Sequence, residues 1–336
     1  MNVVGGNMYA NEKRWTWVYK KKFTQDEMIE NSTKKTIGFS QYAIPNFSQL
    51  IFSWNAARPA GGHFSFYVKT RNASTGRWSK WHKMVDWGVD IQQSYFSRDL
   101  DTKYVYVRLE TGLHHLANAF KIKVEPYGNG DLGLVHGLAV SASDFTKFYA
   151  HPVSKHVLSL KSVHIKKVPK ISQRLLNHPE THRICSPTSC SILAGYFNGY
   201  AIDAAQFADH VFDYGLGVYG SWPFNIAALH NACDNNLFFY TARCNSFLDL
   251  YEHLKRKIPV VVSVRGQIEG APKAYKSGHL MVVVGWDAKR KMVICHDPAF
   301  YADKDTFVKY NIGSFLKAWD NSNRLAYVTE KCGDTF

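Results

Sequence analysis

A cysteine in the second half of the chain has the local setting of a catalytic thiol. Cys185 lies in the segment RICSPTSC of residues 183–190, and Pro187 suits the first turn of a helix. A thiol at a helix start meets the positive end of the helix dipole and free backbone N–H groups, which favour the thiolate and lower its pKa. The sequence therefore predicts Cys185 as a nucleophile.

A nucleophilic thiol needs a base, and a later segment supplies a histidine in a suitable position. His279 precedes the apolar run of residues 280–284, so we expect it at the mouth of a buried strand that fixes the imidazole. Gly278 before it leaves room for a substrate to approach the backbone. His279 is therefore the predicted base.

A third residue should hold the tautomer of the imidazole, and two aspartates are available. Asp297 follows a predicted strand at residues 292–295, and Pro298 would end strand pairing there. Asp287 is the alternative, but its place after Gly285 and Trp286 suggests a turn. The sequence favours Asp297.

The order of these residues resembles the papain-like cysteine peptidases of the bacteriocin-processing group, especially their stand-alone C39-like relatives. That family has a Val-Pro-x-x-Ser-Gln segment shortly before Cys-Gly-Pro-Thr-Ser, and this chain has VPKISQ at residues 168–173 and CSPTS at residues 185–189. The histidine motif is similar to residues 278–287 and the Asp-Pro element to residues 297–298. Ser186 departs from the family's usual glycine. The resemblance covers residue 165 onward.

The resemblance implies a papain-like peptidase domain that cleaves peptide bonds through a thioester, with a peptide or protein as substrate. It implies Cys185 as nucleophile, His279 as general base and then acid, and Asp297 as the orienting residue. Gln173 would donate its side-chain N–H, together with the backbone N–H of Cys185, to the oxyanion. No cofactor or metal is implied. Two alternatives stay open: a carbohydrate- or surface-binding protein on an inactive peptidase-like scaffold, and a papain-fold acyltransferase of the transglutaminase-like type.

Two further features of the second half are candidate sites. His178 and His182 are spaced i, i+4, but Pro179 opposes a shared helix face and no fourth ligand is evident, so we expect no zinc there. Trp222 lies beside small residues and is a candidate substrate-binding residue, although an ordinary buried position at a helix start explains it equally well.

The elements expected to position these residues alternate in type. Helical spacing occurs at residues 187–197, 201–212, 224–233 and 247–257, and strand patterns at residues 260–264, 280–284, 292–295 and 325–328. Helices come first and most strands afterwards, which indicates an α+β fold rather than a parallel βαβ repeat.

The first half has a different residue pattern, in which apolar and polar residues alternate in short segments between turns. Residues 64–68, 105–109 and 120–124 have this pattern, and residues 138–140 and 145–149 could extend it. We expect an antiparallel β-sandwich, with domains at residues 1–160 and 165–336. Its tryptophans and lysines could dock a glycan or an anionic surface, which makes the first domain a possible binding module.

The composition limits the function classes. The 336 residues are 46% hydrophobic and 15% aromatic, which excludes disorder for most of the chain. The net charge of +14 is spread over both halves, +8 in residues 1–160 and +6 in residues 161–336. Nucleic-acid binding is therefore unlikely, because such proteins gather positive charge into a stripe or arm.

All six cysteines lie between Cys185 and Cys332, without disulfide-scaffold density, so mostly reduced thiols are expected. The first 22 residues lack the apolar core of a classical signal peptide, and no apolar run approaches the length of a membrane span. A cytoplasmic location without a transmembrane segment is the expectation, with export by a signal-independent route left open.

Overall fold

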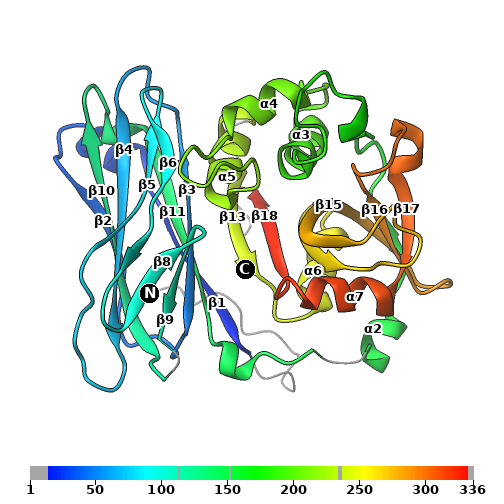
Figure 1. Cartoon of the computed structure of the whole chain (residues 1–336), viewed down its shortest axis with the longest axis horizontal. Helices are drawn as coiled ribbons and strands as arrows, with labels where there is room; N and C mark the ends of the chain where they lie inside the picture. Colours follow the sequence, from blue (N-terminus) through cyan, green and yellow to red (C-terminus); the bar gives the residue numbers. More distant parts are fainter. Residues whose placement is uncertain (1–13, 113, 151–152, 234–236, 332–336) are drawn as a thin grey trace.

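The computed structural model describes residues 14–112, 114–150, 153–233 and 237–331. Helices make up 24% and strands 38% of it, and the sheets are antiparallel. This confirms the predicted α+β class. Figure 1 shows two layers of strands on one side and a mixed helix-and-sheet part on the other, in direct contact.

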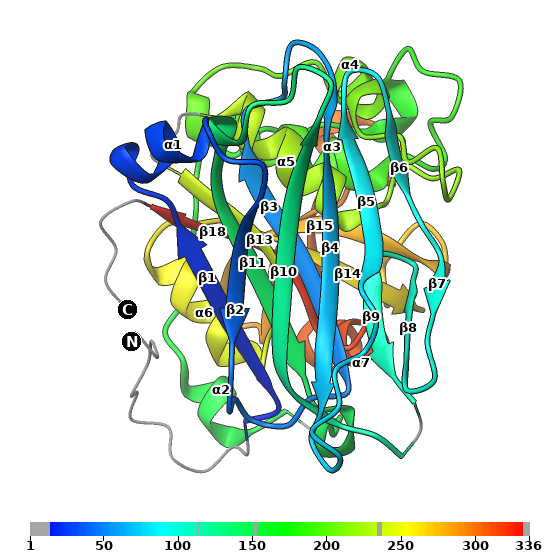
Figure 2. The same cartoon turned by 90° about the vertical axis from the view of Figure 1, so that its left-hand side faces the viewer.

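The first half contains two antiparallel sheets. The six-stranded sheet has the order β1 (Thr16–Lys22), β11 (Val135–Ser143), β3 (Gln49–Ala56), β9 (Arg108–Thr111), β8 (Thr102–Val105) and β7 (Ser97–Arg98). The five-stranded sheet, which faces the viewer in Figure 2, has the order β2 (Ile37–Gln41), β10 (Ala117–Tyr127), β4 (His63–Asn72), β5 (His82–Gly88) and β6 (Gln92–Ser94). The short helix α1 (Gln25–Asn31) connects β1 to β2.

Large aromatic side chains join these two sheets. The Trp54 ring on β3 stacks on the Phe66 ring on β4, with centroids 4.4 Å apart, and Phe52 lies 5.4 Å from Phe66. Phe120 and Val124 on β10 are also completely buried. The alternation predicted at residues 64–68 and 120–124 thus places one side of each strand in an apolar core.

Two predicted strands of the first half are wrong. Residues 105–109 form a hairpin rather than one strand, because Tyr106 and Val107 have positive φ angles of 47° and 54° and the chain reverses between β8 and β9. Of the alternating apolar residues, Val105 at the end of β8 is only partly buried, Val107 is buried within the turn, and Leu109 is buried on β9. Residues 145–149 begin with a 3₁₀ turn, Phe145–Lys147, because the Asp144 side chain accepts a hydrogen bond from the Thr146 N–H.

The second half is built on a seven-stranded antiparallel sheet. Its order is β13 (Leu237–Arg243), β18 (Leu325–Lys331), β14 (Val260–Gly266), β15 (Tyr275–Asp287), β16 (Met292–His296) and β17 (Phe307–Asn311), with β12 (Val163–His164) paired to β15. The helices are α2 (Lys155–Ser159), α3 (Cys185–Asn198), α4 (Ala204–His210), α5 (Trp222–Ala232), α6 (Phe247–Lys255) and α7 (Ile312–Asp320). The predicted helices and strands are confirmed, while β12, β13, β17, α2 and α7 were not predicted.

The free edge of β13 is covered by polar side chains of the six-stranded sheet. Asn55 donates to the Phe239 carbonyl at 2.7 Å and accepts from the Phe239 N–H at 2.9 Å. The Thr241 N–H donates to Ser53 Oγ at 3.2 Å, and the Arg243 N–H donates to Ser141 Oγ at 3.3 Å. These bonds occupy backbone groups that an exposed edge strand would leave open.

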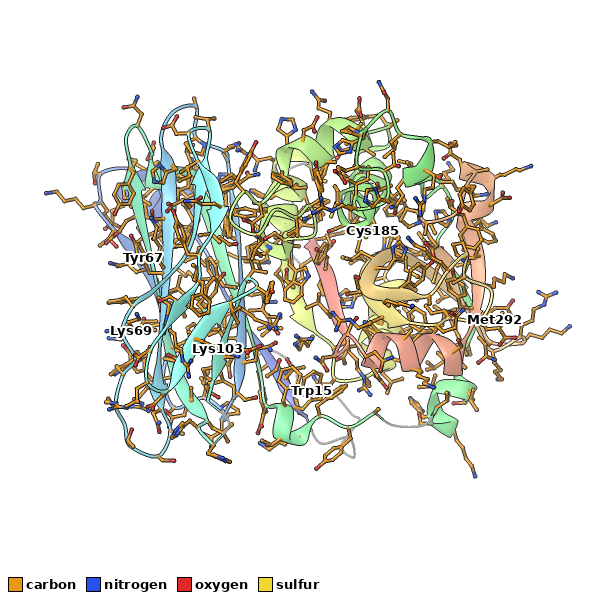
Figure 3. All side chains as sticks on the ribbon, viewed as in Figure 1. Trp15, Tyr67, Lys69, Lys103, Cys185 and Met292 are labelled. Atoms are coloured by element: carbon orange, nitrogen blue, oxygen red, sulfur yellow. The ribbon has the colours of Figure 1, made fainter. Side chains whose placement is uncertain are left out.

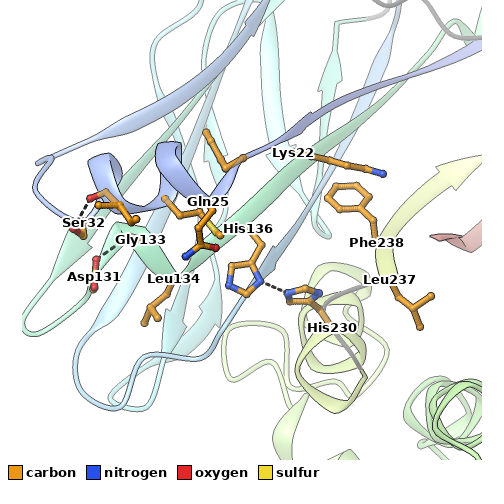
Figure 4. A pocket seen from close by; sticks show the side chains of 13 residues that line it. Lys22, Gln25, Ser32, Asp131, Gly133, Leu134, His136, His230, Leu237 and Phe238 are labelled. Atoms are coloured by element: carbon orange, nitrogen blue, oxygen red, sulfur yellow. Dashed lines mark hydrogen bonds between the residues drawn. The ribbon is translucent and has the colours of Figure 1, made fainter. Parts of the chain in front are cut away.

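The two halves also meet along a histidine pair. His136 on β11 lies 2.7 Å from His230 on α5, measured from Nδ1 to Nε2 (Figure 4). Burial lowers the pKa of His230 to about 4 and also lowers the pKa of His136, so both rings are neutral at pH 7. This neutral histidine pair is therefore a direct contact between the two halves.

No helix among the residues that the structure describes is long and apolar enough to cross a membrane. The expectation of no signal peptide falls largely on residues 1–13, which lie outside the described residues, as does Cys332.

We predict that Asn55→Ala lowers the free energy of unfolding by roughly 2–4 kcal/mol, because it leaves a buried N–H and a buried carbonyl of Phe239 unpaired. Chemical denaturation measures the change. Asn129→Ala, at an exposed position, is the matched control and should cost less than about 0.5 kcal/mol. Equal midpoints for the two variants would contradict the assigned importance of the β13 edge.

Candidate active site

Cys185 is the first residue of the long buried helix α3 (Figure 3). No side chain caps this helix at Ile184, so the positive end of its dipole and its first N–H groups face the thiol region. Cys185 itself is partly exposed, whereas the residues from Ser186 to Gly195 are buried. The sequence prediction of a thiol at a helix start is confirmed.

Ser186 fits this position without strain. Its φ angle is negative, so the site needs no glycine, and its hydroxyl lies 2.9 Å from the Tyr327 hydroxyl on β18. The departure from the Cys-Gly pattern thus adds a polar contact between α3 and the sheet.

His279 lies on β15, and Gly278 before it has a φ angle of +93°. A side chain at Gly278 would meet nothing within 4 Å, so the backbone in front of the imidazole is open. The Tyr275 ring stacks on the His279 ring, with centroids 4.1 Å apart and planes 17° apart. The imidazole is therefore buried against this ring, while the backbone at Gly278 next to it is open.

Asp297 is completely buried just after β16 and accepts four hydrogen bonds. Oδ1 accepts from His279 Nε2 at 2.7 Å and from the Ala299 N–H at 2.9 Å. Oδ2 accepts from the hydroxyls of Tyr275 and Tyr310, each at 2.6 Å. Four donors compensate for the removal of this carboxylate from water.

The thiol, the imidazole and the carboxylate form one interacting chain. Burial raises the pKa of the Cys185 thiol, but the charge of His279, a hydrogen bond from its ring and the Leu280 N–H together bring that pKa below its ordinary value. Burial lowers the pKa of His279, but Asp297 and the Cys185 thiolate outweigh it and raise that pKa. The pKa of Asp297 is lowered despite burial, chiefly by His279. Both shifts favour the charged pair of thiolate and imidazolium over the neutral thiol and imidazole.

Gln173 lies in a 3₁₀ turn, Gln173–Leu175, that runs along the loop after Asp297. Its backbone N–H donates to the Pro298 carbonyl at 2.9 Å, and its Nε2 donates to the Thr181 carbonyl at 2.6 Å. The side chain is buried, and its Oε1 has no partner within the described part of the chain. One side-chain N–H remains for another acceptor.

Comparison with known proteins was made against family models, curated proteins and solved structures. Residues 165–327 match the model of the Peptidase_C39 like family. This part of the chain belongs to that family. No match was found among curated proteins or among solved structures. The C39-like part is thus of the cysteine-peptidase type of hydrolase, and it begins where the sequence resemblance begins.

Asp287 lies elsewhere in the C39-like part. Its carboxylate pairs with Lys309 at 3.0 Å and with Arg290 at 3.4 Å, which lowers its pKa to about 2. His279 bonds to Asp297 instead. His279 thus contacts Asp297, the aspartate that the sequence favours, and not Asp287.

The histidines before Cys185 serve other contacts. His178 Nδ1 accepts from the Glu180 N–H at 3.0 Å, and its Nε2 lies 3.3 Å from Asp209. His182 is mostly exposed beside Glu180. The described ranges hold no group of three or more His, Cys, Asp or Glu residues placed for a metal.

Three groups of the C39-like site escaped the sequence analysis: the hydroxyls of Tyr275 and Tyr310, and the backbone N–H of Leu280. Tyr275 carried no reliable signal, since residues four apart on a regular strand lie about 13 Å from each other. The irregular pairing of β14 with β15 around Gly278, whose φ angle is +93°, accompanies the close stacking of Tyr275 on His279. Tyr310 carried none, because β17, on which it lies, was not predicted and packs beside β16 only in the folded sheet.

We predict that the pH at which alkylation of Cys185 by iodoacetamide reaches half its maximal rate lies below about 8.5, the ordinary pKa of a free thiol. His279→Ala removes the positive charge and the hydrogen bond that lower the pKa of the Cys185 thiol. The thiol stays buried, which raises its pKa, so this midpoint should move upward. His182→Ala, at a mostly exposed position three residues before Cys185, is the matched control and should leave it unchanged.

Mass spectrometry of the peptide that contains Cys185 separates this thiol from the others. An unchanged midpoint in His279→Ala would mean that the imidazole does not activate the thiol.

Proposed function

We propose that this protein hydrolyses peptide bonds as a cysteine peptidase, with Cys185, His279 and Asp297 as its catalytic residues. The observation that carries the proposal is the buried chain from the Cys185 thiol through His279 to Asp297, with opposite pKa shifts for the thiol and the imidazole. Membership of residues 165–327 in a peptidase family supports the same reaction class.

In the acylation step, the Cys185 thiolate attacks the carbonyl carbon of the scissile bond and the carbonyl electrons move to oxygen. The Cys185 N–H and the free side-chain N–H of Gln173 would stabilise this oxyanion. As the electrons return, the C–N bond breaks and His279 gives its proton to the leaving amine, which leaves a thioester on Cys185.

In the deacylation step, neutral His279 takes a proton from water, and the resulting hydroxide equivalent attacks the thioester carbonyl. The C–S bond breaks, the acid leaves, and the thiolate–imidazolium pair is restored. Asp297 keeps Nε2 protonated throughout, so that Nδ1 is free to exchange protons with the sulfur and the substrate.

We also propose two domains, a β-sandwich at residues 1–160 and the peptidase domain at residues 165–336. The shared apolar core between β3 and β4 supports the first unit. The segment next to the proposed boundary contacts the second unit, because β12 pairs with β15 and Lys291 Nζ donates to the Leu158 carbonyl on α2 at 2.6 Å. The contact between them is extensive, so the two are expected to act together.

The function is tested by Cys185→Ala, which should lower kcat/KM for a mixed peptide library by about 10³-fold or more because it removes the nucleophile. Cys233→Ala, at another partly exposed thiol, is the matched control and should retain activity. Full cleavage by Cys185→Ala would rule out this residue as nucleophile. Product analysis with an added amine distinguishes the acyltransferase alternative, in which the amide and not the acid would accumulate.

A second candidate function concerns the outer face of the five-stranded sheet, where lysines and aromatic rings alternate. Lys69 lies 5.4 Å from the Trp78 ring and 4.7 Å from the Trp81 ring. Lys121 lies 5.0 Å from Trp78, and Lys123 lies 5.3 Å from Trp81. We name this set, with Tyr42 and Tyr67, the lysine–aromatic ladder; its Tyr67 and Lys69 are labelled in Figure 3, away from Cys185.

Two ladder lysines lie directly opposite each other, Lys69 on β4 and Lys121 on β10. Like charges in such a pair are destabilising, and no ion pair joins either one to a carboxylate in the described residues. We propose that the ladder binds an acidic polysaccharide, whose sugar rings suit the aromatic faces and whose carboxylates suit the lysines.

The combined variant Lys69→Ala/Lys121→Ala should bind immobilised alginate about five to ten times more weakly than the unaltered protein, because two cations are lost from the face. Lys289→Ala/Lys304→Ala removes two exposed lysines elsewhere and is the matched control. Neutral dextran beads report binding that does not depend on charge. Equal retention of both variants on alginate would contradict the proposed role of the ladder.

A further inference from the structure

A cavity of about 720 Å³ lies between the two halves of the molecule. The first half contributes Gln49 of β3 and Arg108 and Glu110 of β9 to its lining, and the second half contributes Trp222, Arg243 and Arg265. Its size is that of an ordinary ligand pocket. Because both halves form its walls, it exists only in the assembled chain.

Arg243 is a buried cation of this cavity, with 5% of its surface exposed. Its guanidinium donates to Gln49 Oε1 at 2.7 and 3.1 Å, and to the carbonyls of Ser322 at 3.0 Å and Asn323 at 2.8 Å. The Phe145 ring lies 5.1 Å away. All of these partners are neutral, so hydrogen bonds hold the group in place without neutralising its charge.

A buried charge without a counter-charge is costly, and an anion in the cavity would relieve that cost. Burial lowers the pKa of Arg243 to about 9, repulsion from Arg108 adds to the effect, and attraction from Glu110 offsets it only in part. At pH 7 the guanidinium is still protonated and retains its positive charge. The site is therefore an incomplete ion pair.

The rest of the lining reinforces the positive charge. Glu110 is the carboxylate of the lining, and it is already paired with Arg108 at 2.6 Å and with Lys103 at 3.0 Å. Arg265 is exposed at the rim, and its side chain makes no ion pair to the described residues. Three guanidinium groups thus line a cavity whose one carboxylate has two cations of its own.

The cavity adjoins the candidate active site through β14 and β15. Ser263 lines it and is the cross-strand partner of Leu280, whose backbone N–H reaches the Cys185 sulfur. The next residue, Val264, is paired with His279. Paired residues have Cα atoms about 5 Å apart, so the cavity wall at Ser263 lies one strand spacing from Leu280, the neighbour of His279. Cys185, His279 and Asp297 do not line the cavity, so a peptide bound across them would enter it only with residues away from the scissile bond.

We propose that this cavity, with Arg243 in its wall and Arg265 at its rim, binds an acidic side chain of the peptide substrate. The inference rests on the proposed peptidase function and adds a substrate class to it, peptides with Asp or Glu at a position away from the scissile bond. Guanidinium groups suit carboxylates because they offer two parallel N–H donors. Trp222, predicted as a substrate-binding residue, would line the same pocket.

The experiment uses the full chain and a peptide library in which each position in turn is fixed as Glu or as Gln. At one position, the Glu peptides should show kcat/KM about tenfold above the Gln peptides, since a hydrogen-bonded charge pair is worth about that factor. Arg265→Glu should abolish the difference by lowering the rate for Glu peptides alone. Arg290→Glu, an equal charge change at an exposed turn, should keep it.

Binding to the Cys185→Ala protein, measured by calorimetry, provides a readout that does not need hydrolysis. It should bind the Glu peptide about tenfold more tightly than the Gln peptide, and the added change Arg243→Met should remove this difference. Chemical denaturation of the Arg243→Met protein establishes that it is folded. If it is not, Arg265→Glu in the same background decides, because that residue lies at the exposed rim.

The outcomes separate the two proposals. Hydrolysis of Glu and Gln peptides at equal rates would overturn the proposal that the cavity binds an acidic side chain, and would leave the peptidase function standing. Preferential binding of Glu peptides without hydrolysis by the unaltered protein would overturn the peptidase function and support the pocket. If the unaltered protein does not hydrolyse the peptides and the Cys185→Ala protein does not bind the Glu peptide preferentially, both proposals are overturned.

Discussion

A single buried carboxylate sets the arrangement of the C39-like part. Asp297 is removed completely from water, and such a group is tolerated only when donors surround it. Its donors come from separate strands, with His279 and Tyr275 on β15 and Tyr310 on β17. These two strands and β16, which ends just before Asp297, must therefore meet around one point. The position of His279 in front of Cys185 follows from this requirement.

The charges of the site depend on the same carboxylate. A buried imidazolium and a thiolate are each costly alone, but together with Asp297 and the start of α3 they stabilise one another. Burial acts against both charged forms, and the local interactions outweigh it at Cys185 and at His279. Tyr275 and Tyr310 matter here because their hydroxyls donate to Oδ2 and leave Oδ1 for the imidazole.

The first half packs directly on the C39-like part through β3 and β13. Its central strand β3 is buried along its whole length, with apolar residues toward the five-stranded sheet and Gln49, Ser53 and Asn55 toward β13. Those polar residues cover the edge of β13 and hold Arg243 at the cavity wall. A β-rich unit in this position shapes the surroundings of the candidate site as well as presenting its own outer face.

The α+β class, most elements of the second half and the candidate residues Cys185, His279 and Asp297 could be predicted from the sequence, because each has a local signal. Cys185 sits before a helical pattern, His279 before an apolar strand, and Asp297 before a proline. The reversal at Tyr106 and Val107 was hidden, since alternation reads the same on one strand and on two arms of a hairpin.

Partners that lie far apart in the chain could be identified only in the folded protein. Gln49 and Arg243 are separated by 194 residues, and Tyr310 reaches Asp297 from a neighbouring strand. Side chains of this kind have no periodic or spacing signal, because their contacts are fixed by how sheets stack and strands pair. The candidate catalytic residues were therefore visible in local patterns, whereas the cavity and the buried charge of Arg243 arise from the packing of the two halves.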